Sequence, residues 1–287
     1  MHAINPNRKE RWTTEPKTCV IPAAALALAV VLTAASPALA DYWFLGVGNE
    51  GYMDDVDGLF GALTQVDNWQ EDHVHSWLHE DRPGPQVLND LFWLSWYPAA
   101  GDLAVFYYSG HGTQEFDLGF DEPDWNDECI GMPGAVCTDD EIAAELDWLP
   151  SSVPCVAIFD TCHAGGMTGG WDDLDTLSNA YIMMSCAENE SSYGGSPYSE
   201  FTGHLIDGIT RSGDEYRADQ WWHGGNGDGV VTLEEWFAYA DRYTFGQSPQ
   251  FCDTNGLGSL VIATPEPATV CLLGAGALSI LLRRRRR

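Results

Sequence analysis

Short apolar runs that alternate with segments of helical periodicity constrain the fold of this chain more than any other feature. Residues 42–48, 103–108 and 153–159 have the length and composition of buried strands, and the segments between them carry apolar residues at helical spacing. Strands that alternate with helices favour a mainly parallel sheet covered on both faces. We therefore predict a single α/β domain whose sheet is sandwiched by helices.

The same patterns locate the other elements. The long acidic and tryptophan-rich stretch 115–137 lacks such a pattern and is predicted to be a loop inserted after a strand. The expected helices are 56–69, 85–96, 139–149, 200–210 and 232–243, and the further expected strands are 73–78, 180–185 and 258–263.

The N-terminal end has the features of a secretory signal. Four basic residues within the first 17 precede an apolar run over 21–35, and Ala38-Leu39-Ala40 fits a signal-peptidase site. We expect residues 1–40 to be a signal peptide and the mature chain to start at Asp41. The alternative is an uncleaved anchor helix.

The C-terminal end combines three features in order. Pro265-Glu266-Pro267 is followed by a mostly apolar stretch, 268–282, and then by five arginines. The apolar stretch is short for a membrane span, and the arginines would hold their end in the cytoplasm. This order resembles the bacterial PEP-CTERM sorting signal, which implies a Gram-negative-type bacterium and a tail removed by a membrane enzyme. The alternative is a plain single-span anchor.

These ends imply three parts and a location. We expect a signal peptide (1–40), a folded domain (41–264) and a sorting or anchor segment (265–287). The resemblance implies an exported protein of the periplasm, cell surface or extracellular matrix. Export and sorting machinery would be its partners, and it would touch membrane only through its terminal segments.

Charge excludes one class of partner. The chain has a formal net charge of -30, and residues 41–264 contain 40 acidic residues against four arginines and no lysine. A nucleic-acid-binding face needs clustered cations, so nucleic acid is not an expected partner. Basic partners or divalent cations fit this composition better.

Six cysteines lie within 41–264. An even number in an oxidising compartment suggests disulfides. Cys129 and Cys137 flank a short loop and are the predicted pair. Cys155 and Cys186 lie in apolar strand-like runs and are expected to be buried thiols.

Two strand ends carry reactive side chains. One strand runs into Ser109-Gly110-His111-Gly112, and another runs into Asp160-Thr161-Cys162-His163. Functional groups of open parallel sheets lie beyond the carboxyl ends of strands, so His111 and Cys162 should meet at one edge. An imidazole can activate a thiol nucleophile, and glycine permits close approach of a substrate backbone. The alternative is a structural cysteine and a loop histidine.

At these motifs the sequence resembles the caspase-like cysteine peptidases of the metacaspase type, peptidase family C14. The resemblance rests on SGHG after a strand and on DTCHAG after another, with His111 and Cys162 separated by 51 residues. The T-D-D-E run at 138–141 and the apolar strand that ends in Ser185-Cys186-Ala187 add to it. The resemblance implies a caspase-like fold for residues 42–263.

The resemblance also assigns roles. It implies that Cys162 is the nucleophile, that His111 is the general acid/base, and that the N–H groups of Gly112 and Cys162 form the oxyanion hole. Asp160 matches the acid that lines the pocket for a basic residue before the scissile bond; the alternative is a turn-capping aspartate. The family has a second pocket aspartate on its first helix, and the best alignment places Gln65 there, with Asp67 two residues on.

Calcium is the cofactor that the resemblance suggests. Asp127, Asp139 and Asp140 match acids of calcium-activated metacaspases, with Asp172 or Asp173 as a fourth ligand, and hard oxygen ligands suit Ca²⁺. The alternative is a solvated acidic surface.

A second calcium candidate is the segment 224–235, which partly matches an EF-hand loop. Gly224 stands where the first aspartate belongs. Thr232 and Glu235 have the spacing of a capping box, which favours an ordinary turn and helix start.

Three functions compete at this stage. The first is an exported cysteine endopeptidase that cleaves after Arg or Lys in protein or peptide substrates. The second is a catalytically inactive caspase-like module that binds at the surface. The third is an acidic surface protein whose role is Ca²⁺ or matrix association.

Overall fold

The structure is a computed structural model that describes residues 40–116, 122 and 125–264. The predicted sorting segment and all but Ala40 of the predicted signal peptide lie outside these residues. Within the described ranges, no helix is both long enough and apolar enough to cross a membrane.

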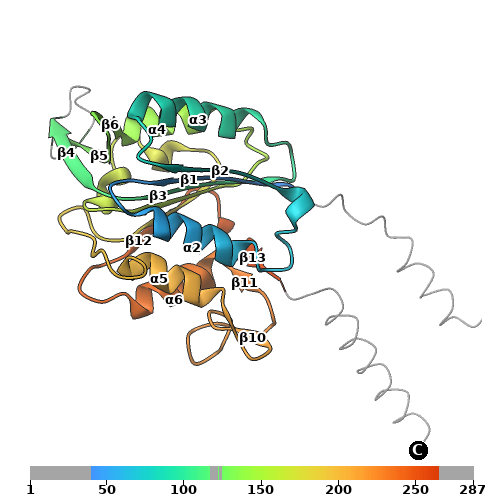
Figure 1. Cartoon of the computed structure of the whole chain (residues 1–287). Helices are drawn as coiled ribbons and strands as arrows, with labels where there is room; N and C mark the ends of the chain where they lie inside the picture. Colours follow the sequence, from blue (N-terminus) through green and yellow to red (C-terminus); the bar gives the residue numbers. More distant parts are fainter. Residues whose placement is uncertain (1–39, 117–121, 123–124, 265–287) are drawn as a thin grey trace, which may run out of the picture. The chain divides into compact units, whose positions relative to one another are not determined.

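A six-stranded sheet forms the centre of the domain (Figure 1). Its order is β2–β1–β3–β7–β8–β12; the first five strands are parallel, and β12 pairs antiparallel with β8. The strands are β1 (Tyr42–Gly48), β2 (Val74–Glu80), β3 (Leu103–Ser109), β7 (Cys155–Asp160), β8 (Ala180–Met184) and β12 (Gln250–Asp253). The predicted α/β architecture is confirmed.

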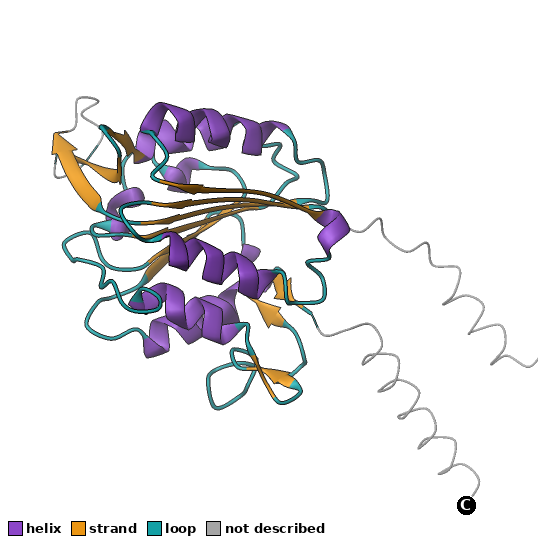
Figure 2. Ribbon diagram, in the orientation of Figure 1, coloured by secondary structure: helices purple, strands orange, loops and turns teal. Residues whose placement is uncertain are grey.

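Helices cover both faces of this sheet (Figure 2). On β3, Val105 and Tyr107 face one core while Phe106 and Tyr108 face the other, because successive side chains of a strand alternate. One core is covered by α2 (Met53–Leu63), α5 (Glu200–Gly208) and α6 (Leu233–Tyr243), and the other by α3 (Gly84–Trp96) and α4 (Asp139–Leu146).

The predicted loop 115–137 is wrong in its described part. Three strands form a separate antiparallel sheet in the order β4–β5–β6. They are short and mix polar with apolar residues, so the sequence shows no long apolar run. The hydrogen bonds between them define these strands. The strands are β4 (Gly112–Phe116), β5 (Asn126–Met132) and β6 (Ala135–Thr138).

The predicted disulfide between Cys129 and Cys137 is also wrong. Both cysteines are free, as are the other four in the described part of the chain. In the β5–β6 register Cys129 lies opposite Thr138 and Cys137 lies opposite Ile130. Because neighbouring positions of a strand point to opposite faces, this register places the two thiols on opposite faces of the hairpin.

Smaller elements complete the domain. The final strand, β13 (Val261–Ala263), pairs with β11 (Val231–Thr232) instead of joining the central sheet, and β9 (Arg211–Ser212) pairs with β10 (Glu215–Tyr216). Thr232 and Glu235 form the expected capping box of α6. In the preceding turn, Asp219 accepts the N–H groups of Gly227, Asp228 and Gly229, which favours the turn over an EF-hand.

Candidate active site

Strand pairing brings the two predicted reactive residues to one edge of the sheet. β3 and β7 are neighbours, and Ser109 pairs with Asp160 at their carboxyl ends. His111 lies two residues after Ser109, and Cys162 lies two residues after Asp160. The N–H of Gly110 donates to the carbonyl oxygen of Asp160 at 3.2 Å, which ties the two turns together.

Gly112 contacts the turn that carries Cys162 so closely that a side chain would not fit. A Cβ atom at Gly112 would lie 2.2 Å from the carbonyl oxygen of Cys162 and 2.4 Å from Oγ1 of Thr161. Glycine is therefore required where the chain after His111 passes the chain at Cys162.

The backbone of His111 is fixed and its ring is exposed. Its carbonyl oxygen accepts hydrogen bonds from the Tyr108 hydroxyl at 2.7 Å and from the Gly131 N–H at 2.8 Å. The side chain is 61% exposed, and Nε2 lies 3.2 Å from Oε2 of Glu50. The ring of Tyr52 meets the imidazole edge-on at 5.9 Å.

Cys162 is partly exposed and lies in a tightly held turn. Before it, the buried Thr161 donates its N–H to Oγ of Ser185 at 3.2 Å. After it, His163 adopts a left-handed conformation with φ of 63°. Nδ1 of His163 lies 2.7 Å from the carbonyl oxygen of Glu188, so the imidazole of His163 is hydrogen-bonded to the backbone of another loop.

Asp160 lies beneath this edge of the sheet, and its side chain is only 3% exposed. Its carboxylate accepts hydrogen bonds from Oγ of Ser192 and from both the N–H and Oγ1 of Thr202. Burial raises the pKa of Asp160 to about 6, although these hydrogen bonds oppose the shift.

The alignment that placed Gln65 and Asp67 in the second acidic position is wrong. Both follow the C-terminal end of α2, where Asp67 pairs with Arg211. The helix starts earlier than predicted, at Met53, and its first turn supplies Asp55. The loop between Gly48 at the end of β1 and Met53 at the start of α2 is short, so the first turn of α2 lies close to the end of β1. Asp55 therefore comes from the N-terminal end of the helix, whereas Gln65 and Asp67 follow its C-terminal end.

Asp55 is the functional candidate that the sequence analysis missed. It is 2% exposed and accepts hydrogen bonds from Oγ of Ser109 and from the N–H and Oγ of Ser199. Its charge contributes to the raised pKa of Asp160, so the two carboxylates are electrostatic neighbours. The sequence feature that could have identified it is an aspartate in the first turn of the helix that follows a buried strand.

A pocket of about 480 Å³ opens beside His111. Asp55 lines it but Asp160 does not, so the predicted lining role of Asp160 is corrected to a buried position behind the pocket. Acidic and small residues dominate the lining, which comprises Glu50, Gly51, Tyr52, Asp54, Asp55, His111, Gly194, Gly195, Pro197 and Ser199.

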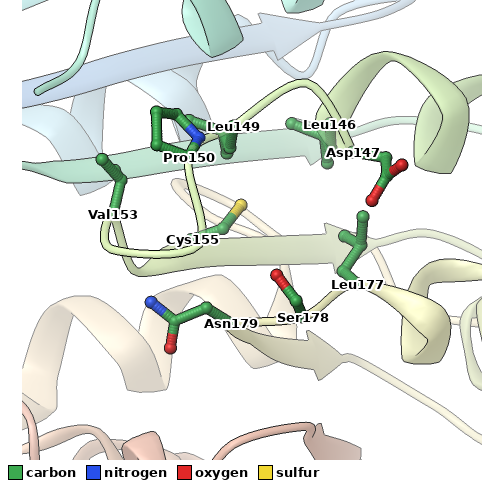
Figure 3. A pocket seen from close by; sticks show the side chains of 9 residues that line it. All are labelled: Leu146, Asp147, Leu149, Pro150, Val153, Cys155, Leu177, Ser178 and Asn179. Carbon is green, nitrogen blue, oxygen red and sulfur yellow. The ribbon is translucent and has the colours of Figure 1, made fainter.

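A second pocket lies at the opposite end of β7 (Figure 3). Its lining includes Cys155, the first residue of β7, together with Leu146 and Leu177. Its volume of about 10 Å³ holds no more than one water molecule and cannot admit a peptide side chain. The pocket beside His111 is the candidate substrate site because it lies at the edge of the sheet where the turns of His111 and Cys162 meet.

A buried acidic cluster lies where β5, α4 and the segment after Cys162 meet. Ligand oxygens of Asp139, Asp140 and Asp173 fall within 4.8 Å of one another, and those of Glu122, Glu128 and Asp139 form an overlapping group. We call these five residues the acidic cluster. Of the predicted calcium ligands, Asp139, Asp140 and Asp173 lie together in one of these groups. Asp127 and Asp172 belong to neither group.

Asp139 belongs to both groups of the acidic cluster. Asp139 is 1% exposed, and its Oδ2 has no hydrogen-bond partner among the described residues. Burial, followed by the charges of Asp173 and Glu128, raises the pKa of Asp139 to about 9. The four arginines of residues 41–264 all bind elsewhere, to Asp90, Asp67, Asp207 and the carbonyl oxygen of Trp222.

Two family models match parts of this chain. Residues 51–169, which include His111 and Cys162, match the family described as "Metacaspase, peptidase C14 domain". Residues 263–287 match the "PEP-CTERM protein-sorting motif".

The similar proteins include metacaspases of fungi and plants. "Metacaspase-1" of Kluyveromyces lactis is 32% identical over 136 residues, covering 42% of this chain and 31% of that protein. "Metacaspase-6" of Arabidopsis thaliana is 30% identical over 125 residues, covering 41% of this chain and 34% of that protein. The matched part therefore spans about a third of these relatives.

Among solved structures, a protein from Geobacter sulfurreducens matches with a TM-score of 0.57. It is 18% identical and covers 79% of this chain and 96% of its own. At this identity the match concerns the fold alone.

Proposed function

From the match of residues 51–169 to the metacaspase peptidase C14 domain and of residues 263–287 to the PEP-CTERM sorting motif, we propose that this chain is an exported cysteine endopeptidase. The observation that carries the proposal is the meeting of the His111 and Cys162 turns beside an acidic pocket. The expected substrates are proteins or peptides.

In the proposed mechanism, the Cys162 thiol loses its proton to His111 and attacks the scissile carbonyl carbon. The N–H groups of Gly112 and Cys162 would stabilise the negative oxygen of the tetrahedral intermediate. His111 then gives the proton to the leaving amine, and an acyl-enzyme remains. Water attacks the thioester with His111 as base, which releases the second product and restores the thiol.

We propose that the pocket beside His111 selects Arg or Lys before the scissile bond. Asp55 lines it and Asp160 lies behind it, and both carboxylates are held by hydroxyl and amide donors. A carboxylate that is already oriented by such donors binds a guanidinium or ammonium group well. Glu50 and Asp54 add negative charge at the pocket rim.

We propose that the acidic cluster binds Ca²⁺. The residues present fit this ion, because carboxylate oxygens are its preferred ligands and a buried oxygen of Asp139 lacks a partner among the described residues. A bound Ca²⁺ would neutralise the repulsion between the carboxylates. Glu128 also packs against the nucleophile turn, since a Cβ atom at Gly166 would lie 2.2 Å from its carboxylate.

Cleavage of a peptide panel by purified residues 41–264 tests the proposed function. The peptides would carry Arg, Lys, Asp or Asn before the scissile bond and would be assayed with a reductant, with and without Ca²⁺. We expect cleavage after Arg and Lys, abolished by Cys162→Ala and by His111→Ala and retained by Cys252→Ala. Cleavage only after Asp would contradict the pocket assignment.

The alternative is a catalytically inactive caspase-like surface binding module. Its sequence-based support was the absence of a second pocket aspartate together with the oxidising location, and the position of Asp55 removes the first of these two arguments. A folded protein whose Cys162 is alkylated by iodoacetamide, and which cleaves none of the peptides, would favour this alternative.

A further inference from the structure

The turn between β1 and α2 places a carboxylate against the imidazole of His111. Oε2 of Glu50 lies 3.2 Å from Nε2 of His111. β1 pairs with β3 up to Gly48 and Ser109, so this turn leaves the sheet beside the turn that carries His111. Glu50 is therefore a neighbour of His111 by topology as well as by distance.

This turn is held in a conformation that non-glycine residues rarely adopt. Glu50 has a φ of 52°, and Asp81 on the adjoining strand end has a φ of 49°. Oδ1 of Asp81 accepts the N–H of Glu50 at 2.7 Å, and the N–H of Asp81 donates to the carbonyl oxygen of Gly48 at 2.9 Å. Such conformations are unfavourable for residues with a Cβ atom and persist only where surrounding contacts impose them.

Stability does not explain this arrangement. The side chains of Glu50 and His111 are 64% and 61% exposed. An ion pair between two exposed side chains contributes little to stability, so it does not offset the cost of the turn. The strained turn is therefore better explained by where it places the Glu50 side chain.

The other contacts of His111 fix its backbone and touch one edge of its ring, so Glu50 is the group that can orient the ring through Nε2. Tyr108 and Gly131 fix the carbonyl group of His111, and Tyr52 touches its ring edge. A carboxylate at Nε2 sets both the ring rotation and the tautomer, because it accepts a hydrogen bond from an Nε2–H.

We propose that Glu50 is a positioning residue for His111. Its carboxylate accepts the hydrogen bond of Nε2–H, which leaves Nδ1 to exchange a proton with the Cys162 thiol and with the leaving amine. The reactive unit then has three members, Glu50, His111 and Cys162. This inference rests on the proposed peptidase function and assigns a role within the same site.

Glu50 also lines the acidic pocket, which offers a different explanation of its placement. If it serves only to attract a basic substrate, its removal should raise KM and leave kcat unchanged. If it positions His111, its removal should lower kcat and leave KM unchanged. Kinetic constants therefore separate the two roles.

The test compares Glu50→Ala and Glu50→Gln with the matched control Glu71→Ala, an exposed glutamate at the start of the turn before β2. We expect Glu50→Ala to lower kcat for an Arg peptide about tenfold with KM within about twofold, the scale of loss on removing a group that orients a histidine. Glu50→Gln should keep most of kcat, because its amide oxygen still accepts the hydrogen bond. Glu71→Ala should match the wild type.

Two kinetic outcomes would overturn the proposal. One is a higher KM with unchanged kcat in Glu50→Ala, and the other is an equal loss of kcat in the Ala and Gln variants.

A second readout does not depend on peptide cleavage. The rate of Cys162 alkylation by iodoacetamide at pH 7 should fall severalfold in Glu50→Ala and stay near the wild-type rate in Glu50→Gln. Equal rates in all three proteins would overturn the role of Glu50. If the wild type alkylates but cleaves no peptide, the proposed peptidase function fails while the alkylation rates still decide the role of Glu50.

Discussion

Two groups of buried acids in this domain are organised in opposite ways. Asp55 and Asp160 receive hydrogen bonds from serine and threonine hydroxyls and from backbone N–H groups. In the acidic cluster, Asp139 lies among other carboxylates and keeps one oxygen without a partner in the described structure. The chain itself supplies hydrogen-bond donors to both carboxylates of the first group, whereas one buried oxygen of Asp139 in the second group receives none from the described residues.

This difference separates recognition from regulation in the proposed enzyme. A pocket that must bind a cationic side chain benefits from carboxylates that stay oriented before the substrate arrives. A site that must respond to a free cation benefits from carboxylates that repel one another until it binds. Substitution, cation addition and pH each test this contrast.

The largest effect is expected from Asp55→Asn. Loss of one charge from an oriented and buried pair should lower kcat/KM for an Arg peptide about 100-fold, equivalent to about 2.7 kcal/mol. The exposed Asp57 on the same helix provides the control variant Asp57→Asn, which should change kcat/KM less than twofold. Peptide cleavage assays check both, and equal effects of the two variants would contradict a role for Asp55.

Calcium should stabilise the protein through the acidic cluster alone. At a free concentration 100 times the Kd, binding adds about 2.7 kcal/mol, or about 5–10 °C in Tm for a domain of this size. Asp139→Asn should abolish this shift, whereas Asp55→Asn should leave it intact. Thermal melts with Ca²⁺ and with a chelator measure both, and an equal Ca²⁺ response in the two variants would refute the assignment.

Stability without a cation should depend on pH in a defined direction. Asp139 and Asp173 have pKa values raised by burial to about 9 and about 6, from an ordinary value of 3.8. Because the folded state holds these protons more tightly than the unfolded state, the free energy of unfolding should fall as the pH rises from about 4 to 9.

Denaturant melts at several pH values with a chelator would measure this slope. Asp139→Asn should flatten it, most clearly above pH 6, where the Asp173 carboxyl has already titrated. The slope should also become smaller in wild type when Ca²⁺ is added. A slope that neither Ca²⁺ nor the substitution changes would place its origin outside the acidic cluster.

The smallest effect is expected from Asp127→Asn and Asp172→Asn. Both residues were predicted ligands, and neither joins the acidic cluster. Each variant should keep the Ca²⁺-dependent rise in Tm within about 1 °C of the wild type, because surface changes away from a site have small effects. A lost response in either variant would show that the ligand set is wider than the cluster.

Local sequence patterns predicted most of the central sheet. Buried parallel strands are apolar throughout, so 42–48, 103–108 and 153–159 could be recognised one by one. The three-stranded sheet around β5 was missed because its strands are short and mix polar with apolar residues. Their stability comes from pairing with one another, which a single segment does not reveal.

The sequence by itself determined that the turns of His111 and Cys162 meet. Each turn directly follows a recognisable strand, and parallel neighbouring strands must deliver their ends to the same edge. Asp139 was also named from the sequence, but only the tertiary structure placed Asp55 and Glu50 in the pocket beside His111 and decided which acids surround Asp139. These acids come from separate segments, so their pairing depends on how the whole chain packs.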